Sequence, residues 1–166
     1  MIPSQLFLQE AGDEFPYISA EPLDPGLILS KAHHPGAGAI VLFSGETRDQ
    51  SRGKEVSYLE YEAHEAIAKN MIGEILKEAA EKWDLKLVFA QHRIGKVGIM
   101  ETAVVVVTAS AHRSEAYKAN KFIIDKIKHE VPIWKNEFYK DGSSEWGGNC
   151  SCAEKTGDPA KHIYED

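Results

Sequence analysis

The chain has 166 residues, of which 43% are hydrophobic and 27% are charged, as in one globular domain and unlike a disordered chain. Lys and Arg number 19 against 26 Asp and Glu, so the net charge is −7. This charge disfavours nonspecific nucleic-acid binding but leaves room for a small anionic ligand in a local basic pocket. We expect a cytoplasmic protein, because no apolar run could span a membrane, no secretory signal is visible and two cysteines are too few for a disulfide framework.

Apolar patterning in the first half of the chain predicts a strand, a short helix, two strands and a long helix, in this order. A weak strand candidate at 5–8 precedes a short helix at 25–32, whose first turn contains a proline. Runs of β-branched and aromatic residues predict strands at 39–44 and 56–61. From 64 to 83 the apolar residues recur every three or four positions with Glu and Lys between them, which predicts a half-buried helix.

The second half of the chain continues the pattern with strands in pairs. Its strand candidates are the runs at 87–91, 103–108 and, more weakly, 134–139. Residues 95–98 contain two glycines, and we expect them to form part of a turn. A second long helix should begin near 112–114, where Ser114 can cap the free N–H groups, and should end near Glu130.

This order of elements predicts the fold class. Consecutive strands without a helix between them favour an α+β fold over a doubly wound α/β fold, with a mixed, largely antiparallel sheet and two long helices. The chain becomes rich in Gly and Ser from Asp141 onward and shows no clear period there. We therefore expect a single α+β domain over residues 1–146 and a C-terminal tail over residues 147–166.

The residues that could carry chemistry are basic side chains at the ends of elements. The chain lacks a P-loop, a dinucleotide-binding fingerprint and a G-x-S-x-G nucleophile elbow. Arg48 follows the first strong strand, His112 and Arg113 open the second long helix, and Lys128 and Lys135 flank the end of that helix. A helix N-terminus attracts anions, so His112 and Arg113 suit an anion site. The alternative is that each of these residues is an ordinary surface charge.

A metal site finds little support in the sequence. Cys150 and Cys152 are separated by one residue, and His162 follows in the tail. Structural zinc sites need four ligands and usually space their cysteines by two to four residues. We therefore expect no metal.

Several segments, taken together and in this order, resemble the large, catalytic subunit of molybdopterin synthase, the MoaE family. They are GAIVLFSGETRD at 38–49, HRIGKV at 92–97, VTASAHRSEAY at 107–117, FIIDKIKHEVPIWKNE at 122–137 and the later Trp146. The S-A-H-R segment and the D-x-x-K…P-x-W-K segment are specific in combination. The likeness is looser before residue 38 and poor in the tail.

The resemblance implies an α/β hammerhead-type fold and a homodimer that binds a small ubiquitin-like sulfur-carrier subunit at each end, giving a heterotetramer. The Gly-Gly C-terminus of the carrier, activated as a thiocarboxylate, would give its sulfur to cyclic pyranopterin monophosphate. Two such transfers would build the dithiolene of molybdopterin, a step of molybdenum cofactor biosynthesis that consumes no metal, nucleotide or other cofactor.

The resemblance also implies which residues form the site. Lys128 and Lys135 would be the catalytic lysines. The residues implied to bind the substrate are Glu46, Thr47, Arg48, His112, Arg113, Asn136 and Glu137. Relatives often place an arginine a few residues after the tail tryptophan, whereas Gly-Gly-Asn-Cys follows Trp146 here, so another cation substitutes for it or the contact is weaker.

The implied chemistry agrees with the basic residues. A cyclic phosphate and a thiocarboxylate are both anions, and Arg, His and Lys that converge on them would stabilise the charge that develops on the leaving phosphate oxygen. A desolvated lysine near other cations has a lowered pKa and can exchange protons. The sequence does not divide the proton-transfer and positioning roles between the two lysines, and our working hypothesis gives proton transfer to Lys135.

Two other functions fit the same residues. One is a different enzyme for phosphate ligands on the same scaffold, which would not depend on a thiocarboxylated partner. The other is a non-catalytic module that captures a ubiquitin-like tail, for which Lys128 and Lys135 would be dispensable.

Overall fold

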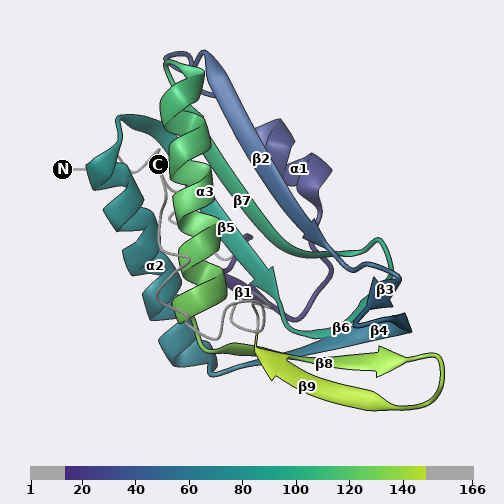
Figure 1. Cartoon of the computed structure of the whole chain (residues 1–166). Coiled ribbons are helices and arrows are strands. Elements are labelled where there is room, and N and C mark those ends of the chain that lie inside the picture. The colour runs from purple at the N-terminus through teal and green to yellow at the C-terminus, as the bar shows by residue number, and fades with distance from the viewer. Residues whose placement is uncertain (1–13, 149–166) are drawn as a thin grey trace.

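The structure is a computed structural model that describes residues 14–148. Its helices are α1 (Pro25–Lys31), α2 (Glu65–Lys82) and α3 (Arg113–Glu130). Its strands are β1 (Ile18–Ser19), β2 (Ala39–Glu46), β3 (Gln50–Ser51), β4 (Lys54–Ala63), β5 (Leu85–Arg93), β6 (Gly95–Gly98), β7 (Thr102–Ser110), β8 (Ile133–Tyr139) and β9 (Ser144–Gly148). The predicted α+β class with two long helices is confirmed (Figure 1).

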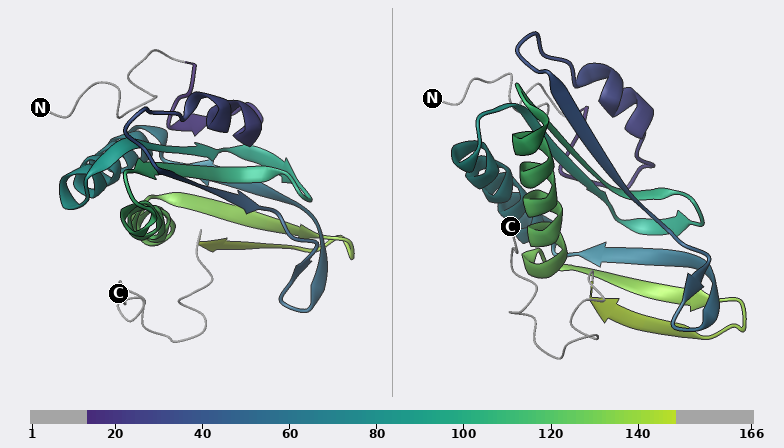
Figure 2. Two further views of the ribbon diagram at one scale, coloured as in Figure 1. Left: turned by 90° about the horizontal axis from the view of Figure 1, so that it is seen from above. Right: turned by 45° about the horizontal axis from the view of Figure 1, so that its top comes forward.

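The first sheet has four strands in the order β1-β5-β7-β2 and is covered by helices on both faces (Figure 2). All of its pairings are antiparallel except β1 with β5, which is parallel. Along β7, Val104 and Val106 pack in the cluster with α2 and α3, whereas Val105 and Val107 pack in the cluster with α1. Because side chains alternate between the two faces, a strand buried on both sides becomes the unbroken apolar run seen in the sequence.

The second sheet lies beyond the ends of β2, β5 and β7 and carries strands in the order β3-β4-β8-β9 (Figure 1). β6 pairs with the other edge of β4. The pairing of β4 with β8 sets Tyr61 opposite Lys135 and Leu59 opposite Glu137. Leu59 and Tyr61 belong to the main hydrophobic core, so we call the sheet face that carries these four residues the inner face of the second sheet.

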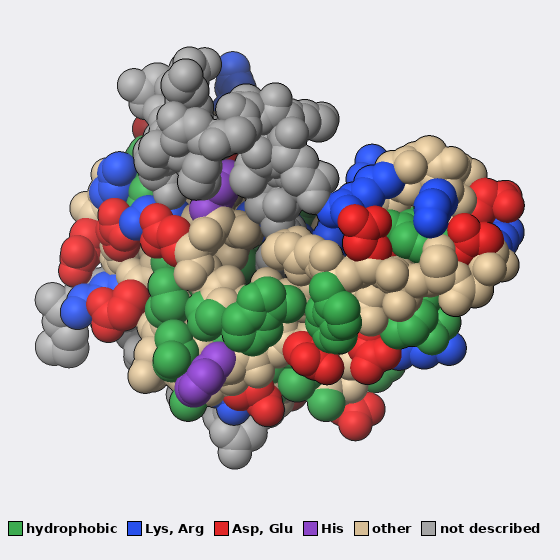
Figure 3. Space-filling model, turned by 60° about the horizontal axis from the view of Figure 1, so that its bottom comes forward, with side chains coloured by type: hydrophobic (Ala, Val, Ile, Leu, Met, Phe, Trp, Pro, Cys, Tyr) green, Lys and Arg blue, Asp and Glu red, His purple; other side chains and the backbone are tan. Residues whose placement is uncertain are grey.

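The outer face of the second sheet carries the residues in between. Trp134, Phe138 and Trp146 lie on it by alternation and register, and the Phe138 ring stacks on Tyr58 with 4.5 Å between the ring centroids. Trp134 and Trp146 are about half exposed. A view with the lower side of the molecule turned forward shows hydrophobic side chains gathered beside acidic ones (Figure 3).

Two expectations for the second sheet are wrong. Residues 95–98 form strand β6 rather than part of a turn, because Gly95–Gly98 pairs with Tyr58–Tyr61 of β4. The region after Asp141 is not all tail, because β9 forms a hairpin with β8 and continues past residue 146 to Gly148. Both are short, glycine-containing edge strands, which lack the alternation by which strands are predicted. The weak strand candidate at 5–8 lies outside the described residues.

A histidine occupies the N-cap position of each of the two long helices. His64 is the N-cap of α2, and its Nδ1 accepts a hydrogen bond from the Ile67 N–H at 3.4 Å. His112 is the N-cap of α3 and makes no side-chain cap hydrogen bond. The expected cap at Ser114 is therefore wrong, because this residue already lies in the first turn of the helix. Within residues 14–148, no helix has the length and apolar character needed to cross a membrane.

A buried amide joins α3 to the first sheet. The Asn120 Nδ2 donates to the carbonyl oxygens of Val41 at 3.0 Å and Val106 at 3.1 Å, so it links the helix to β2 and β7 together. Asn120 is 5% exposed. A buried amide is stabilising only while its hydrogen bonds are made, so the position of α3 on the sheet depends on this side chain.

We predict that Asn120→Ala lowers the free energy of unfolding by about 1–3 kcal/mol, because two buried carbonyl groups lose their donor. Urea unfolding monitored by circular dichroism measures the change. Lys118→Ala is the matched control, since Lys118 is exposed on the same helix and its replacement should change the stability by less than about 0.5 kcal/mol. Equal stabilities of the two variants would contradict the linking role of Asn120.

Candidate functional site

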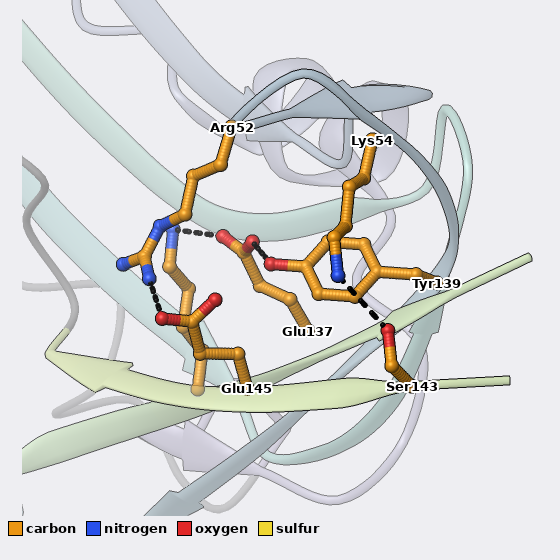
Figure 4. Close-up of polar contacts among 7 residues, drawn as sticks. Arg52, Lys54, Glu137, Tyr139, Ser143 and Glu145 are labelled. Atoms are coloured by element: carbon orange, nitrogen blue, oxygen red, sulfur yellow. Dashed lines mark hydrogen bonds and ion pairs between the residues drawn. The ribbon is translucent and has the colours of Figure 1, made fainter. Parts of the chain in front are cut away.

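The centre of the site is a row of polar residues on the inner face of the second sheet. Alternation along β8 places Lys135, Glu137 and Tyr139 on this face. The Lys135 Nζ lies 3.3 Å from the Glu137 Oε1. The Tyr139 hydroxyl donates to the Glu137 Oε2 at 2.7 Å (Figure 4). The carboxylate of Glu137 therefore has a cation on one oxygen and a hydroxyl donor on the other.

Glu137 is held as an anion inside the protein. Its side chain is 6% exposed. Burial acts to raise the pKa of Glu137, but hydrogen bonds from Tyr139 and Ser51, together with the charge and hydrogen bond of Lys135, hold it below its usual value. The site thus contains a fixed negative charge around which the cations are arranged.

Lys128 approaches this row from the last turns of α3. Burial and then the positive charge of Lys135 lower its pKa from 10.5 to about 8. Both causes disfavour the charged form of Lys128, because its ammonium group loses hydration and faces a like charge. Its amine can therefore gain and lose a proton near neutral pH.

A buried tyrosine completes the inner face beside the two lysines. Tyr61 of β4 lies directly across from Lys135, and its ring makes an edge contact with His92 at 5.0 Å between centroids. Burial, and secondarily the charge of Glu137, raise the pKa of Tyr61 to about 12. Tyr61 therefore remains a neutral phenol throughout the physiological range.

The loop after β2 brings in three of the expected substrate-binding residues. Thr47 is buried and its backbone pairs with the loop of residues 100–101, from the Thr47 N–H to the Glu101 carbonyl at 3.2 Å and from the Met100 N–H to the Thr47 carbonyl at 2.9 Å. Glu46 and Arg48 are exposed on either side of it. The chain then enters the β3–β4 hairpin, whose Ser51 bonds Glu137, so this loop adjoins the polar row.

The Thr47 hydroxyl is notable within this loop. Its oxygen is buried and has no hydrogen-bond partner among the described residues. A buried hydroxyl without a partner is costly unless a ligand or water pairs with it. This state agrees with a substrate-binding role for the loop.

Three expected residues do not join Lys128 and Lys135 within one chain. Asn136 lies on the outer face of the second sheet, because neighbouring residues of a strand point to opposite sides. His112 and Arg113 are exposed at the start of α3, about 22 Å along the helix axis from Lys128 at a rise of about 1.5 Å per residue. The expectation that His112 and Arg113 lie near Lys128 and Lys135 is therefore wrong for a single chain.

Sequence reasoning missed the residues that hold Glu137. Tyr139 follows Glu137 by two positions, so the alternation of a strand could have placed it on the same face as Lys135. Ser51 could not have been found in this way, because its contact depends on how the β3–β4 hairpin folds onto β8. The tail cysteines and His162 lie outside the described residues.

Comparisons with known proteins place this chain in a family. The family model described as MoaE protein matches residues 18–130. A molybdopterin synthase catalytic subunit from Thermoplasma volcanium is 40% identical over 129 residues, which cover 78% of this chain and 94% of the relative. The corresponding subunit from Bacillus subtilis is 42% identical over 132 residues, covering 80% of this chain and 83% of the relative.

Solved structures agree with the sequence relatives. The crystal structure of molybdopterin synthase from Staphylococcus aureus matches with a TM-score of 0.74 and 37% identity, covering 80% of this chain and 96% of that chain. A MoaE protein from Burkholderia ambifaria matches with a TM-score of 0.70 and 27% identity, covering 91% of this chain and 99% of that chain. The fold is thus that of an α+β enzyme subunit of cofactor biosynthesis. The chain belongs to the MoaE family of molybdopterin synthase catalytic subunits, as its resemblance to that family implied.

Lys128 should make the protein less stable at neutral pH than above pH 10. Its folded pKa of about 8 lies below the usual 10.5, so between these values the unfolded chain binds more protons and the free energy of unfolding rises with pH. We predict that Lys128→Met raises the free energy of unfolding at pH 7 by about 1–3 kcal/mol, and that this gain shrinks above pH 10.

Urea unfolding of both proteins at pH 7 and pH 10.5 measures this difference. Lys121→Met is the control, because Lys121 is an exposed residue of the same helix, paired with Asp125 at 2.6 Å. A Lys128→Met gain that does not change with pH would show that the pKa of Lys128 is not lowered in the folded protein.

Proposed function

We propose that the chain transfers sulfur from the thiocarboxylated Gly-Gly C-terminus of a small ubiquitin-like carrier to cyclic pyranopterin monophosphate, forming the dithiolene of molybdopterin. Membership of the MoaE family supports the reaction, and the Lys128–Lys135–Glu137 arrangement is the observation that carries its chemistry. The proposed compartment is the cytoplasm, and the reaction consumes no cofactor.

In the proposed reaction the thiocarboxylate sulfur attacks a carbon of the pterin side chain. A C–S bond forms as the C–O bond to the phosphate breaks, and negative charge develops on the leaving phosphate oxygen. Fixed cations at that position lower the barrier, because they need no reorganisation as the charge appears. Water then cleaves the acyl–sulfur bond, which leaves sulfur on the pterin and a carboxylate on the carrier. A second carrier supplies the second sulfur by the same attack and hydrolysis at the neighbouring side-chain carbon, whose oxygen leaves as water.

The contacts of the two lysines support different roles for them. Lys135 is held 3.3 Å from the Glu137 carboxylate, and this fixed contact suits a group that positions the substrate. Lys128 has the lowered pKa, which suits proton exchange with the reacting groups. We therefore move the proton-transfer role from Lys135, where the sequence hypothesis put it, to Lys128.

The assembly we propose is a homodimer with one carrier at each end. His112 and Arg113 lie at the opposite end of α3 from Lys128, so they can serve the same substrate only if a second copy supplies them. A protein with this fold from Helicobacter pylori, 22% identical and matching with a TM-score of 0.66, is described as a complex of subunits 1 and 2 of molybdopterin-converting factor. We expect the carrier of the present chain to dock in a comparable complex.

Reconstitution tests the proposed function. The purified chain is incubated with a thiocarboxylated carrier and cyclic pyranopterin monophosphate, and dithiolene formation is followed. Product that requires the thiocarboxylate supports the proposal. Turnover of the phosphate substrate without the carrier would favour a different phosphate-ligand enzyme, and full activity of Lys128→Ala and Lys135→Ala would favour a docking module without chemistry.

Arginine substitutions separate the two lysine roles. We predict that Lys135→Arg keeps activity within about tenfold, because a guanidinium can pair with Glu137 and keep the charge. Lys128→Arg should lose about 10²-fold or more, because arginine does not release a proton in the accessible pH range. Single-turnover rates, with a melting curve for each variant, measure both effects. The reverse order of losses would return proton transfer to Lys135.

Mixed dimers test the shared site. We predict that a His112→Ala, Arg113→Ala double variant and a Lys128→Ala variant are each nearly inactive alone. Mixed in equal amounts and allowed to exchange subunits, they should recover about a quarter of wild-type activity, because half of the dimers then contain one intact site. Lack of recovery, with exchange confirmed by differently tagged chains, would contradict the contribution of a second subunit.

A further inference from the structure

The pairing of β8 with β9 leaves an open position beside Lys135. Gly147 lies directly across from Lys135, and Glu145 lies directly across from Glu137, so both belong to the inner face of the second sheet. Gly147 offers no side chain there. A Cβ atom at Gly147 would lie 3.5 Å from the Arg52 Nη2, so the guanidinium of Arg52 occupies the space that a larger residue would fill.

The charges on this face are matched across the strands. Two carboxylates directly opposite each other, here Glu137 and Glu145, repel unless cations compensate them. Lys135 pairs with Glu137, and Arg52 pairs with Glu145 (Figure 4). The charge of Arg52 also acts to lower the pKa of Tyr139, whose hydroxyl bonds Glu137, although burial and the two carboxylates together raise that pKa to about 12. Arg52 is thus within electrostatic range of the polar row.

The backbone at Arg52 gives no structural reason for an arginine. Arg52 has φ 53° and Gly53 has φ 76°, so the turn between β3 and β4 is left-handed at both positions. Glycine or asparagine suits such a turn, and an arginine is strained there. The side chains of Arg52 and Glu145 are 31% and 51% exposed, and ion pairs at that exposure add little stability. Strained residues of this kind persist where the side chain has a task.

We propose that Arg52 is a substrate-binding residue of the site, whose guanidinium stands beside Lys135 and binds the phosphate of the substrate. This inference rests on the proposed function. A guanidinium is a planar fork, so one edge can remain on Glu145 while another binds a phosphate oxygen. Arg52 and Lys135 then hold the phosphate from the β3–β4 turn and from β8.

The competing interpretation is that Arg52 only fastens the β3–β4 hairpin to β9. Two variants separate the interpretations, because each removes a different partner of the Arg52–Glu145 ion pair. Arg52→Asn removes the cation and suits the left-handed turn, whereas Glu145→Gln removes the carboxylate and leaves the cation. Lys54→Gln is the control, since Lys54 belongs to the same hairpin and lies 3.5 Å from its own partner Asp141.

The readouts are binding of inorganic pyrophosphate and of cyclic pyranopterin monophosphate by calorimetry at low salt, melting curves, and KM and kcat of dithiolene formation. We expect Arg52→Asn to weaken the binding of both ligands, and to raise KM, by about tenfold or more, with a melting temperature that is unchanged or higher. Glu145→Gln should bind both ligands as tightly as the wild type or more tightly, because a competing anion is gone. Lys54→Gln should bind them as the wild type does.

Equal effects of Arg52→Asn and Glu145→Gln on binding, or a lower melting temperature of Arg52→Asn with unchanged binding, would overturn the proposal in favour of a fastening role. Failure of the wild type to bind either ligand would overturn it as well. Anion binding that depends on Arg52 in a protein that forms no dithiolene would instead sink the proposed function and support the assignment of Arg52.

Discussion

The arrangement of the site depends on a carboxylate buried in a small sheet. An ionised carboxyl group removed from water is tolerated only where donors and a cation replace its hydration. Glu137 obtains these from Tyr139, from Ser51 and from Lys135. Since Ser51 belongs to the β3–β4 hairpin, the requirement of one carboxylate also sets how that hairpin lies on β8. The Glu137 carboxylate thus binds both Lys135 and Ser51, and its contact with Ser51 holds the end of the loop after β2 beside the site.

A protein of net charge −7 can in this way present cations to an anionic substrate. On the inner face of the second sheet, Glu137 forms an ion pair with Lys135, and Glu145 forms an ion pair with Arg52. Lys128 adds a cation whose charge is disfavoured by burial and by Lys135. An arriving phosphate changes that balance, since a nearby anion favours the protonated amine. In the proposed reaction, substrate binding would then be coupled to proton uptake at Lys128, and departure of the phosphate would favour release of the proton.

The parts of the fold that could be predicted from sequence are those in which one strong periodicity dominates. The strand at 103–108 is predictable because burial on both faces makes it a continuous apolar run. The helix at 64–83 is predictable because burial on one face makes its apolar residues recur every three or four positions. β6 and β9 were missed because an edge strand of Gly and polar residues is specified by its partner strand and not by its own composition. Alternation along β8 places Lys135 and Glu137 on one face of the sheet and Asn136 on the other. Arg113 and Lys128 cannot contact each other within one chain because they lie near opposite ends of α3, whose 18 residues extend over about 27 Å.

The same geometry offers a physical explanation for the lack of an arginine after Trp146. Gly147 stands where a side chain could enter the inner face beside Lys135, and the guanidinium of Arg52 fills that space from a different hairpin. A glycine at that point and an arginine in a left-handed turn are each unfavourable when considered alone, one for strand propensity and the other for backbone strain. Together they are consistent, because a side chain longer than alanine at residue 147 would compete with the guanidinium for this space, and Glu145 pairs with the guanidinium. In the proposed site, the chain would draw one cation from its own β3–β4 turn, while His112 and Arg113 would come from a second copy.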